Sequence, residues 1–217
     1  MTAPSKPQNA LRTYNKADVI IVHKTKESFG GLSNMASGFP LNINGVRVLT
    51  SEALYQACRF PHLPDLQRTI IQQTSPMTAK MKSKPFRDRS RPDWDTVKYR
   101  IMRWCLRTKL AQNYDSFGRL LLATEDKQIV EMSLKDDYWG AKLQAPTYDI
   151  LIGENVLGRL LMELRELLKN DNDQNLTNNK PLNIPDFLIF NEPIREVKIN
   201  KKETSIQKDF FNRTNIK

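Results

Sequence analysis

The leucine-rich segment that follows Asn155 constrains the fold more than any other part of the sequence. Its apolar residues recur at intervals of three or four positions, at Val156, Leu157, Leu160, Leu161, Leu164, Leu167 and Leu168. This period places them on one face of an amphipathic helix, and such a face must be buried against other elements. The segment therefore predicts a long core helix that ends near Lys169, with Asn155 placed to cap its first turn.

Four shorter segments ahead of it also carry helical signals. They cover residues 51–60, 65–73, 94–111 and 115–122. Thr50 or Ser51 can cap the first and Asp93 the third, because a side-chain oxygen at that position accepts a hydrogen bond from a free backbone N–H. Pro61 ends the first helix.

Strand signals are fewer and shorter. Residues 18–23 (DVIIVH) form a β-branched run, and residues 128–133 (QIVEMS) alternate in polarity. Asn44-Gly45 separates two short apolar runs and is a strong hairpin signal. The sequence therefore predicts an α+β fold, a mostly helical single domain with a small β-sheet.

Composition shifts mark the domain boundaries. Residues 1–15 are polar and are expected to form a flexible N-terminal segment, and residues 16–169 form the domain. Residues 170–217 form a linker and a C-terminal extension, of which residues 181–200 are apolar enough to dock as an edge strand despite three prolines. The remaining tail is expected to be loose, with Phe210 and Phe211 able to anchor it.

Several compositional features bear on the cellular setting. No apolar run approaches the ~18–20 residues that a bilayer span requires, and the N-terminus lacks the apolar segment of a secretory signal. The two cysteines, Cys58 and Cys105, lie among apolar residues of expected helices and are read as buried free thiols. We therefore expect a cytoplasmic protein that has no membrane partner.

Charge is distributed unevenly along the chain. The net charge is +10, and residues 80–109 contain eleven basic and three acidic residues. A concentrated basic segment attracts polyanions such as nucleic acid or a pyrophosphate, although a solvated basic face is an equally simple interpretation.

Familiar catalytic constellations are missing from the sequence. Two histidines and two separated cysteines do not make a usual zinc site, and no phosphate-loop, dinucleotide or serine-hydrolase motif occurs. We expect chemistry without a metal or cofactor, from carboxylates, lysines and aromatic residues.

Three local features could supply that chemistry. Glu52 opens a helix, where the helix dipole alone could explain a carboxylate. Residues 136–140 (DDYWG) put two acids before an aromatic residue, although a surface turn would also account for them. Trp94 follows the arginine-rich stretch and could merely pack at a helix entry.

Eight ordered motifs resemble the NADAR (YbiA-like) family. They are LSNM at 32–35, TSEALYQACRF at 50–60, SPMTAKM at 75–81, RPDWDTVK at 91–98, LLAT at 121–124, IVE at 129–131, DDYWG at 136–140 and GENVLGRLLM at 153–162. The resemblance spans residues 19–168. Two departures stand out, because Ala53 replaces the usual histidine and residues 141–146 replace a glycine-rich stretch.

The resemblance implies cleavage of a ribose–nitrogen bond. It places the carboxylates Glu52 and Asp137 in the pocket, where one stabilises the cationic sugar or activates water and an acid protonates the leaving base. Trp94 is expected to present a flat face to a base or sugar. Lys80, crowded by basic neighbours, is expected to attack an opened ribose or to contact phosphate. The expected substrate-binding residues are Asn34, Tyr55, Arg91, Asp136, Trp139, Gly140 and Asn155.

Two activities of the resembling family compete for this sequence. One is removal of ADP-ribose from guanine bases of nucleic acid, which would make the chain an antitoxin to a DarT-type toxin. The other is hydrolysis of riboflavin-pathway intermediates, and a non-enzymatic ADP-ribose or nucleic-acid binding module is a third reading. The focused basic segment favours ADP-ribosylated DNA or nucleotide as the substrate.

Overall fold

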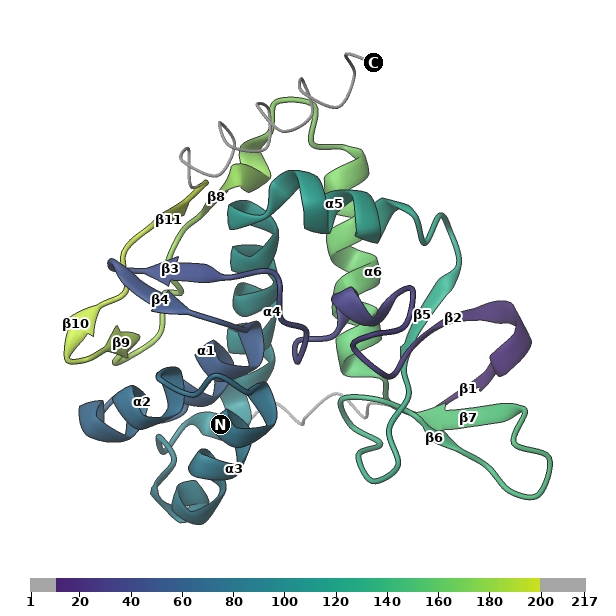
Figure 1. Ribbon diagram of the computed structural model, residues 1–217, viewed down its shortest axis with the longest axis horizontal. Helices are drawn as coiled ribbons and strands as arrows, with labels where there is room; N and C mark the ends of the chain where they lie inside the picture. The colour runs from purple at the N-terminus through teal and green to yellow at the C-terminus, as the bar shows by residue number, and fades with distance from the viewer. Residues whose placement is uncertain (1–10, 200–217) are drawn as a thin grey trace, which may run out of the picture.

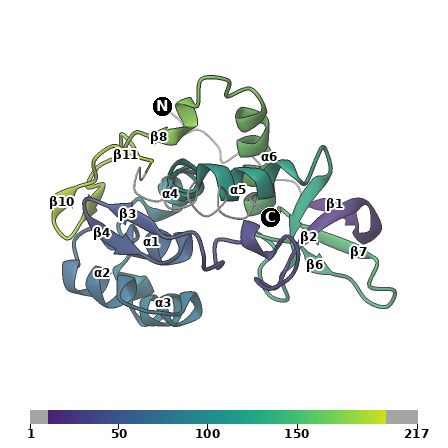
Figure 2. The ribbon, with the colours of Figure 1, turned by 45° about the horizontal axis from the view of Figure 1, so that its top comes forward.

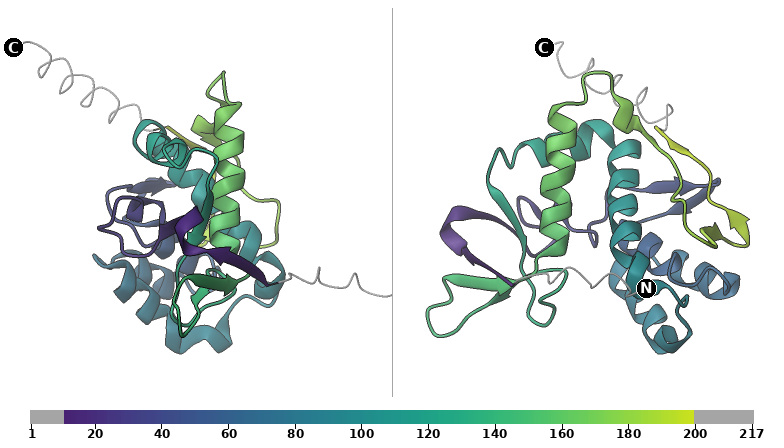
Figure 3. Two further views of the ribbon diagram at one scale, coloured as in Figure 1. Left: turned by 90° about the vertical axis from the view of Figure 1, so that its right-hand side faces the viewer. Right: turned by 180° about the vertical axis from the view of Figure 1, so that it is seen from behind.

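Two helices form the centre of the molecule in the computed structural model, which describes residues 11–199. Helices α4 (Trp94–Gln112) and α6 (Val156–Lys169) lie side by side, as Figures 1 and 3 show. Their facing side chains, among them Ile101 and Leu161, are fully buried. Burial of each such side chain stabilises the fold by about 1.5–3 kcal/mol. The long core helix predicted from the leucine period is confirmed.

The sequence predicts caps for three helices, and the structure confirms one of the three. Helix α1 (Ser51–Ala57) is capped by Thr50, whose hydroxyl accepts a hydrogen bond from the Ala53 N–H at 3.2 Å. Asp93 does not cap α4, because its carboxylate is bound by the Arg91 guanidinium. Asn155 does not cap α6 with its side chain, because that side chain binds strand backbone instead.

The smaller helices pack around this centre. Helix α1 lies with α2 (Pro64–Ile71) and α3 (Pro76–Ser83) on one side of α4, and α5 (Tyr114–Leu122) packs against α6 (Figure 2). Helix α3 is absent from the sequence prediction. Its start signals are present, since Ser75 accepts a hydrogen bond from the Thr78 N–H and Pro76 occupies the first position.

Short strands form several small sheets. Strands β1 (Arg12–Asn15), β7 (Ile150–Gly153) and β6 (Lys142–Leu143) make a three-stranded antiparallel sheet in the order β1-β7-β6. Strands β2 (Val19–Val22) and β5 (Gln128–Glu131) pair in parallel. The final residues of the expected flexible segment 1–15 are thus ordered by pairing, while residues 1–10 lie outside the described part of the chain.

The predicted hairpin is present. Strands β3 (Leu41–Ile43) and β4 (Val46–Val48) pair in antiparallel orientation. Asn44 and Gly45 both have positive φ, 53° and 86°, which a two-residue turn of this kind requires. The α+β class and the small sheets therefore match the expectation.

The C-terminal extension runs along α4 (Figure 3). It forms two short antiparallel pairs, β8 (Asn178–Asn179) with β11 (Val197–Lys198) and β9 (Leu188–Ile189) with β10 (Glu192–Pro193). The single edge strand expected here is replaced by these pairs, because the extension satisfies its polar groups on α4 as well as on itself. The tail that holds Phe210 and Phe211 lies outside the described residues.

The extension is fastened to α4 by side-chain hydrogen bonds. Asn179 donates to the Trp104 carbonyl at 3.0 Å, and the Trp104 indole N–H donates to the Lys180 carbonyl at 2.9 Å. Phe187 and Ile189 are buried in the main core. Residues 170–199, the described part of the extension, therefore pack as an integral part of the domain.

The structure also bears on the two cysteines and on whether a helix could span a membrane. Cys58 and Cys105 are both free and buried, as predicted. Within residues 11–199, no helix has the length and apolar character needed to cross a membrane.

Candidate active site

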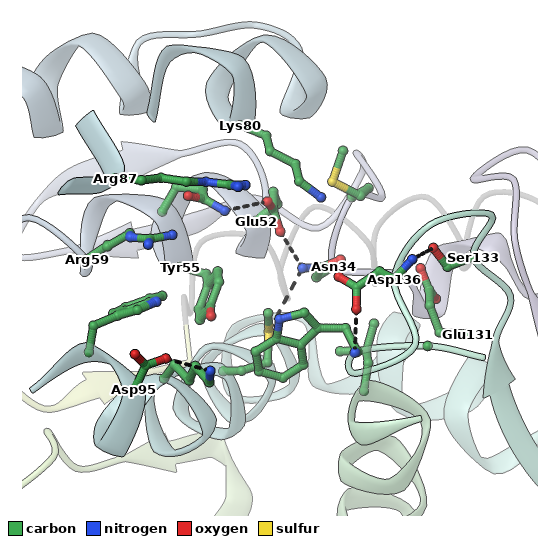
Figure 4. Close-up of a pocket in the computed structure, with 18 residues that line it drawn as sticks. Asn34, Glu52, Tyr55, Arg59, Lys80, Arg87, Asp95, Glu131, Ser133 and Asp136 are labelled. Carbon is green, nitrogen blue, oxygen red and sulfur yellow. Dashed lines mark hydrogen bonds and ion pairs between the residues drawn. The ribbon is translucent and has the colours of Figure 1, made fainter. Parts of the chain in front are cut away.

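A cavity of about 350 Å³ opens between helices α1 and α3 on one side and the end of β5 on the other, with the first turns of α4 beneath (Figure 4). It gathers eight of the eleven side chains expected at the site. They are Asn34, Glu52, Tyr55, Lys80, Trp94, Asp136, Trp139 and Gly140. The motifs that are scattered in sequence thus meet at one place.

Glu52 lies at the floor of this cavity and is only 3% exposed. Asn34 Nδ2 donates to Glu52 Oε2 at 2.5 Å, and Gln56 Nε2 donates to Oε1 at 2.8 Å. Burial raises the pKa of Glu52, while nearby Lys80 and the two amide donors act in the opposite direction. The arrangement holds the carboxylate in one orientation, which capping a helix does not require.

The two amides are themselves held. The Ser83 hydroxyl lies 2.7 Å from Gln56 Oε1, so helix α3 orients the amide that binds Glu52. The Asn34 carbonyl accepts hydrogen bonds from the Glu52 N–H at 3.0 Å and from the Ser51 hydroxyl at 3.1 Å. The loop and the start of α1 are therefore locked together around the carboxylate.

A buried lysine holds the loop that carries Asn34. Lys109 Nζ donates to the carbonyl of Gly31, within η2 (Gly30–Leu32), at 2.6 Å. It also donates to the carbonyl of Ser33, directly after η2, at 3.0 Å. Burial lowers the pKa of Lys109 to about 7. Lys109 therefore belongs to the support of the site and not to the basic face expected from its segment.

Glu131 is a site residue that the sequence reasoning missed. It lines the cavity at the carboxyl end of β5, and its Oε2 is buried without a hydrogen-bond partner among the described residues. Burial raises the pKa of Glu131 to about 8, and neighbouring Glu52 adds to the rise. A carboxylate ending a buried parallel strand is a recurrent position for active-site residues, and this signal was available in the IVE motif.

The DDYWG loop is shaped by its first acid. Asp136 Oδ1 accepts hydrogen bonds from the N–H groups of Tyr138 and Trp139 at 3.0 and 2.9 Å. Gly140 is required because a Cβ there would lie 2.3 Å from the Glu131 carbonyl oxygen. The loop thus approaches the β5 backbone closely. It brings Asp136 over the cavity (Figure 4) and contributes Trp139 to the cavity lining.

The structure places Asp137 outside the cavity lining. Its side chain is 52% exposed and forms an ion pair with Lys142. That ion pair lowers the pKa of Asp137, whereas an acid that protonates a leaving group needs a raised pKa. Of the two adjacent acids, Asp136 is the one that faces the pocket.

Arg91 and Asn155 also lie outside the lining. Arg91 is buried, binds Asp93 in a bidentate manner and donates to the Pro185 carbonyl at 2.5 Å, so it ties the extension to the core. Asn155 donates to the Ile129 carbonyl at 2.8 Å and accepts from the Glu131 N–H at 3.0 Å. Asn155 therefore positions the strand end that carries Glu131.

Aromatic rings form one wall of the cavity. The Tyr55 ring lies 5.0 Å from that of Trp94 and 5.6 Å from that of Trp139, measured between centroids. Trp94 is only 7% exposed, and the Arg59 guanidinium covers its ring at 4.8 Å. Trp139 is half-buried and is the ring better placed to stack on a ligand.

Four cationic side chains line the cavity, Arg59, Lys80, Arg87 and Lys98, and Lys98 is paired with Asp95 at 2.7 Å. Lys80 points from α3 toward Glu52 (Figure 4), so a carboxylate is its neighbour inside the pocket. Its chain neighbours Lys82 and Lys84 are exposed, and Lys82 lines a different surface pocket. The expected crowding of Lys80 by those two lysines is therefore not what the structure shows.

The structure also bears on metal binding. Among residues 11–199, no group of three or more histidine, cysteine or acidic side chains is arranged to hold a metal ion. The titratable groups that converge at the cavity are carboxylates and cations. The arrangement provides one carboxylate held by amide donors, one buried carboxyl with a raised pKa, and positive charge for an anionic ligand.

Comparison with known proteins assigns the family. The NADAR domain model matches residues 21–169. "N-glycosidase YbiA" of Escherichia coli K12 is 38% identical over 154 residues, which cover 69% of this chain and 88% of that protein. An N-glycosidase of Nostoc punctiforme is 31% identical over 153 residues, covering 70% of this chain and 93% of that protein.

A solved structure agrees with this assignment. The NMR structure of E. coli YbiA superimposes with a TM-score of 0.58 at 33% identity, and the match covers 70% of this chain and 86% of that one. The chain belongs to the NADAR domain family of YbiA-like N-glycosidases.

Proposed function

We propose that this enzyme removes ADP-ribose from guanine bases of nucleic acid by hydrolysing the ribose–nitrogen bond. The observation that carries the proposal is the set of four cations, Arg59, Lys80, Arg87 and Lys98, that line the same cavity as the buried Glu52. A diphosphate brings two negative groups to this set, and cations near them stabilise its bound form. The focused basic character suits a substrate attached to nucleic acid.

Two carboxyl groups divide the chemistry. Glu52, held by Asn34 and Gln56, faces the developing positive charge at the anomeric carbon or activates the attacking water. Glu131, with its raised pKa of about 8, keeps a proton at neutral pH and donates it to the departing base. Burial raises the pKa of both groups, but Glu52 accepts two amide hydrogen bonds that oppose the rise, whereas one oxygen of Glu131 has no partner among the described residues; Glu131 is therefore assigned as the acid.

The aromatic wall and the loop orient the substrate. Trp139 stacks on the base or sugar, a contact that contributes about 1–3 kcal/mol. The free carboxylate oxygen of Asp136 is available to a ribose hydroxyl, since only its Oδ1 accepts loop N–H groups. Lys80 contributes charge to a phosphate. Its alternative role as a Schiff-base nucleophile predicts a covalent adduct when turnover occurs with borohydride, and the absence of an adduct would leave the carboxylate route.

The direct test uses DNA that carries guanine-linked ADP-ribose. Wild-type enzyme is expected to release free ADP-ribose and restore unmodified guanine, measured by chromatography of the products. A DarT-type transferase can prepare this substrate, and reversal of its modification would give the chain the role of an antitoxin. No release by the wild type would overturn the proposal.

A second candidate substrate is a phosphorylated riboflavin-pathway intermediate. It is favoured by a Vibrio vulnificus relative named "Riboflavin biosynthesis protein", which is 31% identical over 159 residues and is covered by this chain over 40% of its length. Such a metabolite has one phosphate, so it contacts fewer of the four cations that line the cavity. Parallel assays of both substrates at equal concentration decide between them through kcat/KM.

A further inference from the structure

A second groove lies on α4 away from the active site. It has a volume of about 600 Å³ and is bounded by α4 on one side and by the C-terminal extension on the other. Its polar lining is rich in arginine, lysine and asparagine and includes Arg100, Arg103, Arg107, Lys180, Asn175 and Asn178. The extension that forms one wall lies beyond residues 21–169, the part of the chain that matches the NADAR domain.

The charge of this groove is strongly unbalanced. Arg100, Arg107 and Lys180 form no ion pair with any residue in the described part of the chain. The acid in the lining is Glu196, and Lys198 already neutralises it at 3.2 Å. Three cations that have no paired acid in one groove create a positive potential there, and this potential attracts an anionic ligand.

Unused hydrogen-bond donors accompany the charge. Within residues 11–199 the side chains of Arg107 and Lys180 make no hydrogen bond, whereas the Nη2 of Arg103 is already bound to Glu163 at 2.7 Å and to the Tyr99 hydroxyl at 2.9 Å. The side chains of Asn175 and Asn178 are exposed in the same groove. The site thus offers guanidinium, ammonium and amide donors, the groups that bind phosphate oxygens.

The spacing of the arginines indicates more than one phosphate. Arg100 and Arg107 are seven residues apart on one helix, which separates them by about 10 Å along its axis. Trp104 is buried, with its indole N–H used by the Lys180 carbonyl, so no exposed aromatic face is offered for base stacking there. These features suit the backbone of a polyanion and give it no means of reading base identity.

The groove and the active site lie on opposite faces of α4. Lys98 and Met102 line the catalytic cavity, whereas Arg100, Arg103 and Arg107 line the groove. A single nucleotide cannot occupy both places, because the helix between them is about 10 Å wide. A strand of several nucleotides can cross that width.

We propose that the groove between α4 and the C-terminal extension binds the sugar–phosphate backbone of the nucleic acid that carries the modified base. The part of this inference that concerns a modified base rests on the proposed function. Binding of unmodified nucleic acid is a property that can be measured without any turnover, so the two ideas fail separately.

The test measures binding of a labelled, unmodified DNA strand of about 12 nucleotides by fluorescence anisotropy. For the double variant Arg100→Ala/Arg107→Ala, the Kd is expected to rise about tenfold near 50 mM salt, and the salt dependence to weaken by about 0.7 per lost phosphate contact. The matched control is Arg12→Ala/Lys16→Ala, which removes the same charge from exposed positions on β1 and η1 (Lys16–Asp18). The control is expected to bind like the wild type.

A second variant guards against loss of structure. Arg100 also donates to the Asn183 carbonyl at 3.2 Å, so its removal could loosen the extension. Arg107→Glu breaks no hydrogen bond of the described fold and is expected to weaken binding at least as much as the double variant, with an unchanged melting temperature. Equal Kd values for the groove variants and the control, or no DNA binding by the wild type, would overturn the proposal.

Catalytic assays separate this inference from the proposed function. The groove variants are expected to raise KM about tenfold on an ADP-ribosylated oligonucleotide, and to leave hydrolysis of an ADP-ribosylated guanosine nucleotide unchanged. DNA binding without release of ADP-ribose would defeat the proposed function and keep the groove. If the wild type releases ADP-ribose from DNA and the groove variants have no effect, the groove proposal is overturned and the proposed function is kept.

Discussion

The floor of the active-site cavity and the surface outside it use carboxyl groups in opposite ways. At the floor, Glu52 and Glu131 are buried, and burial raises the pKa of both. Outside the cavity lining, Asp137 is exposed and its ion pair with Lys142 lowers its pKa. Burial, and not the density of acids in the sequence, therefore distinguishes the carboxyl groups with a raised pKa from the one with a lowered pKa.

The largest loss of activity is expected when the buried carboxylate of Glu52 at the cavity floor is removed. Glu52→Gln keeps the shape but cannot carry the negative charge, so kcat is expected to fall by about 10³-fold with little change in KM. Steady-state kinetics on the ADP-ribosylated substrate measure the effect. Undiminished turnover would remove Glu52 from the chemistry, and thermal melting of the variant provides the control for folding.

The next largest effect is expected at the second floor carboxyl. Glu131→Gln retains hydrogen-bonding capacity but has no proton to give to the leaving base, so kcat at neutral pH is expected to fall by about 10²-fold. A substrate with a better leaving group should recover much of that loss, because it needs less protonation. Equal losses for both substrates would argue that Glu131 has only a packing role.

A smaller loss is expected when the floor carboxylate loses one support. Asn34→Leu deletes the donor to Glu52 Oε2, and a hydrogen bond to a charged group contributes about 1.5–3 kcal/mol, so a tenfold to ~100-fold decrease in kcat is expected. That hydrogen bond lowers the pKa of Glu52, and its loss should move the acid limb of the rate profile to higher pH. An acid limb that stays in place would show that Asn34 does not act through Glu52.

The smallest effect is expected on the surface outside the cavity. Asp137→Asn breaks an ion pair between two exposed side chains, which contributes about 0–1 kcal/mol, so kcat/KM should change less than about fivefold. Lys142→Ala serves as the matched variant for the other partner of the pair. A hundredfold loss in Asp137→Asn would return this residue to the catalytic set.

Much of the fold could be predicted from local pattern. The leucine period of α6, the Asn44-Gly45 hairpin and the Thr50 cap each depend on residues close in sequence, and each is found. Asp93 and Asn155 were expected to cap helices, but the neighbouring Arg91 binds the first side chain and the backbone of β5 binds the second. Cap prediction fails where another group competes for the same side chain, whether that group is near or far in sequence.

The site was predictable in membership more than in role. The motifs bring eight of eleven expected side chains to one cavity, yet adjacent acids could not be told apart before the loop was seen. Asp136 faces inward because the loop N–H groups of Tyr138 and Trp139 bind it. Glu131 was missed because its function depends on the parallel pairing of β5 with β2, a contact between segments more than one hundred residues apart.

The basic segment shows the same limit of local reasoning. Its residues share a stretch of chain but not a face, because α3 and α4 turn them in different directions. Lys80 and Lys98 line the catalytic cavity, Arg107 lines the second groove, and Lys109 is buried under the Asn34 loop. Net charge indicated an anionic ligand, and the structure separates that charge into distinct sites.

The most direct test of the contrast between the buried carboxyl groups of the cavity and the exposed Asp137 is the pH dependence of kcat/KM for the wild type and Glu131→Gln. Glu131 must be protonated to act as an acid. Burial, with a contribution from Glu52, raises its pKa to about 8 against the opposing effects of the Ser33 hydrogen bond and the charges of Lys109 and Lys80. The wild-type rate is therefore predicted to fall as pH rises through about 8, and the variant is predicted to be slow but flat across that range. An alkaline limb that persists unchanged in Glu131→Gln would contradict the assignment of the buried carboxyl as the proton donor.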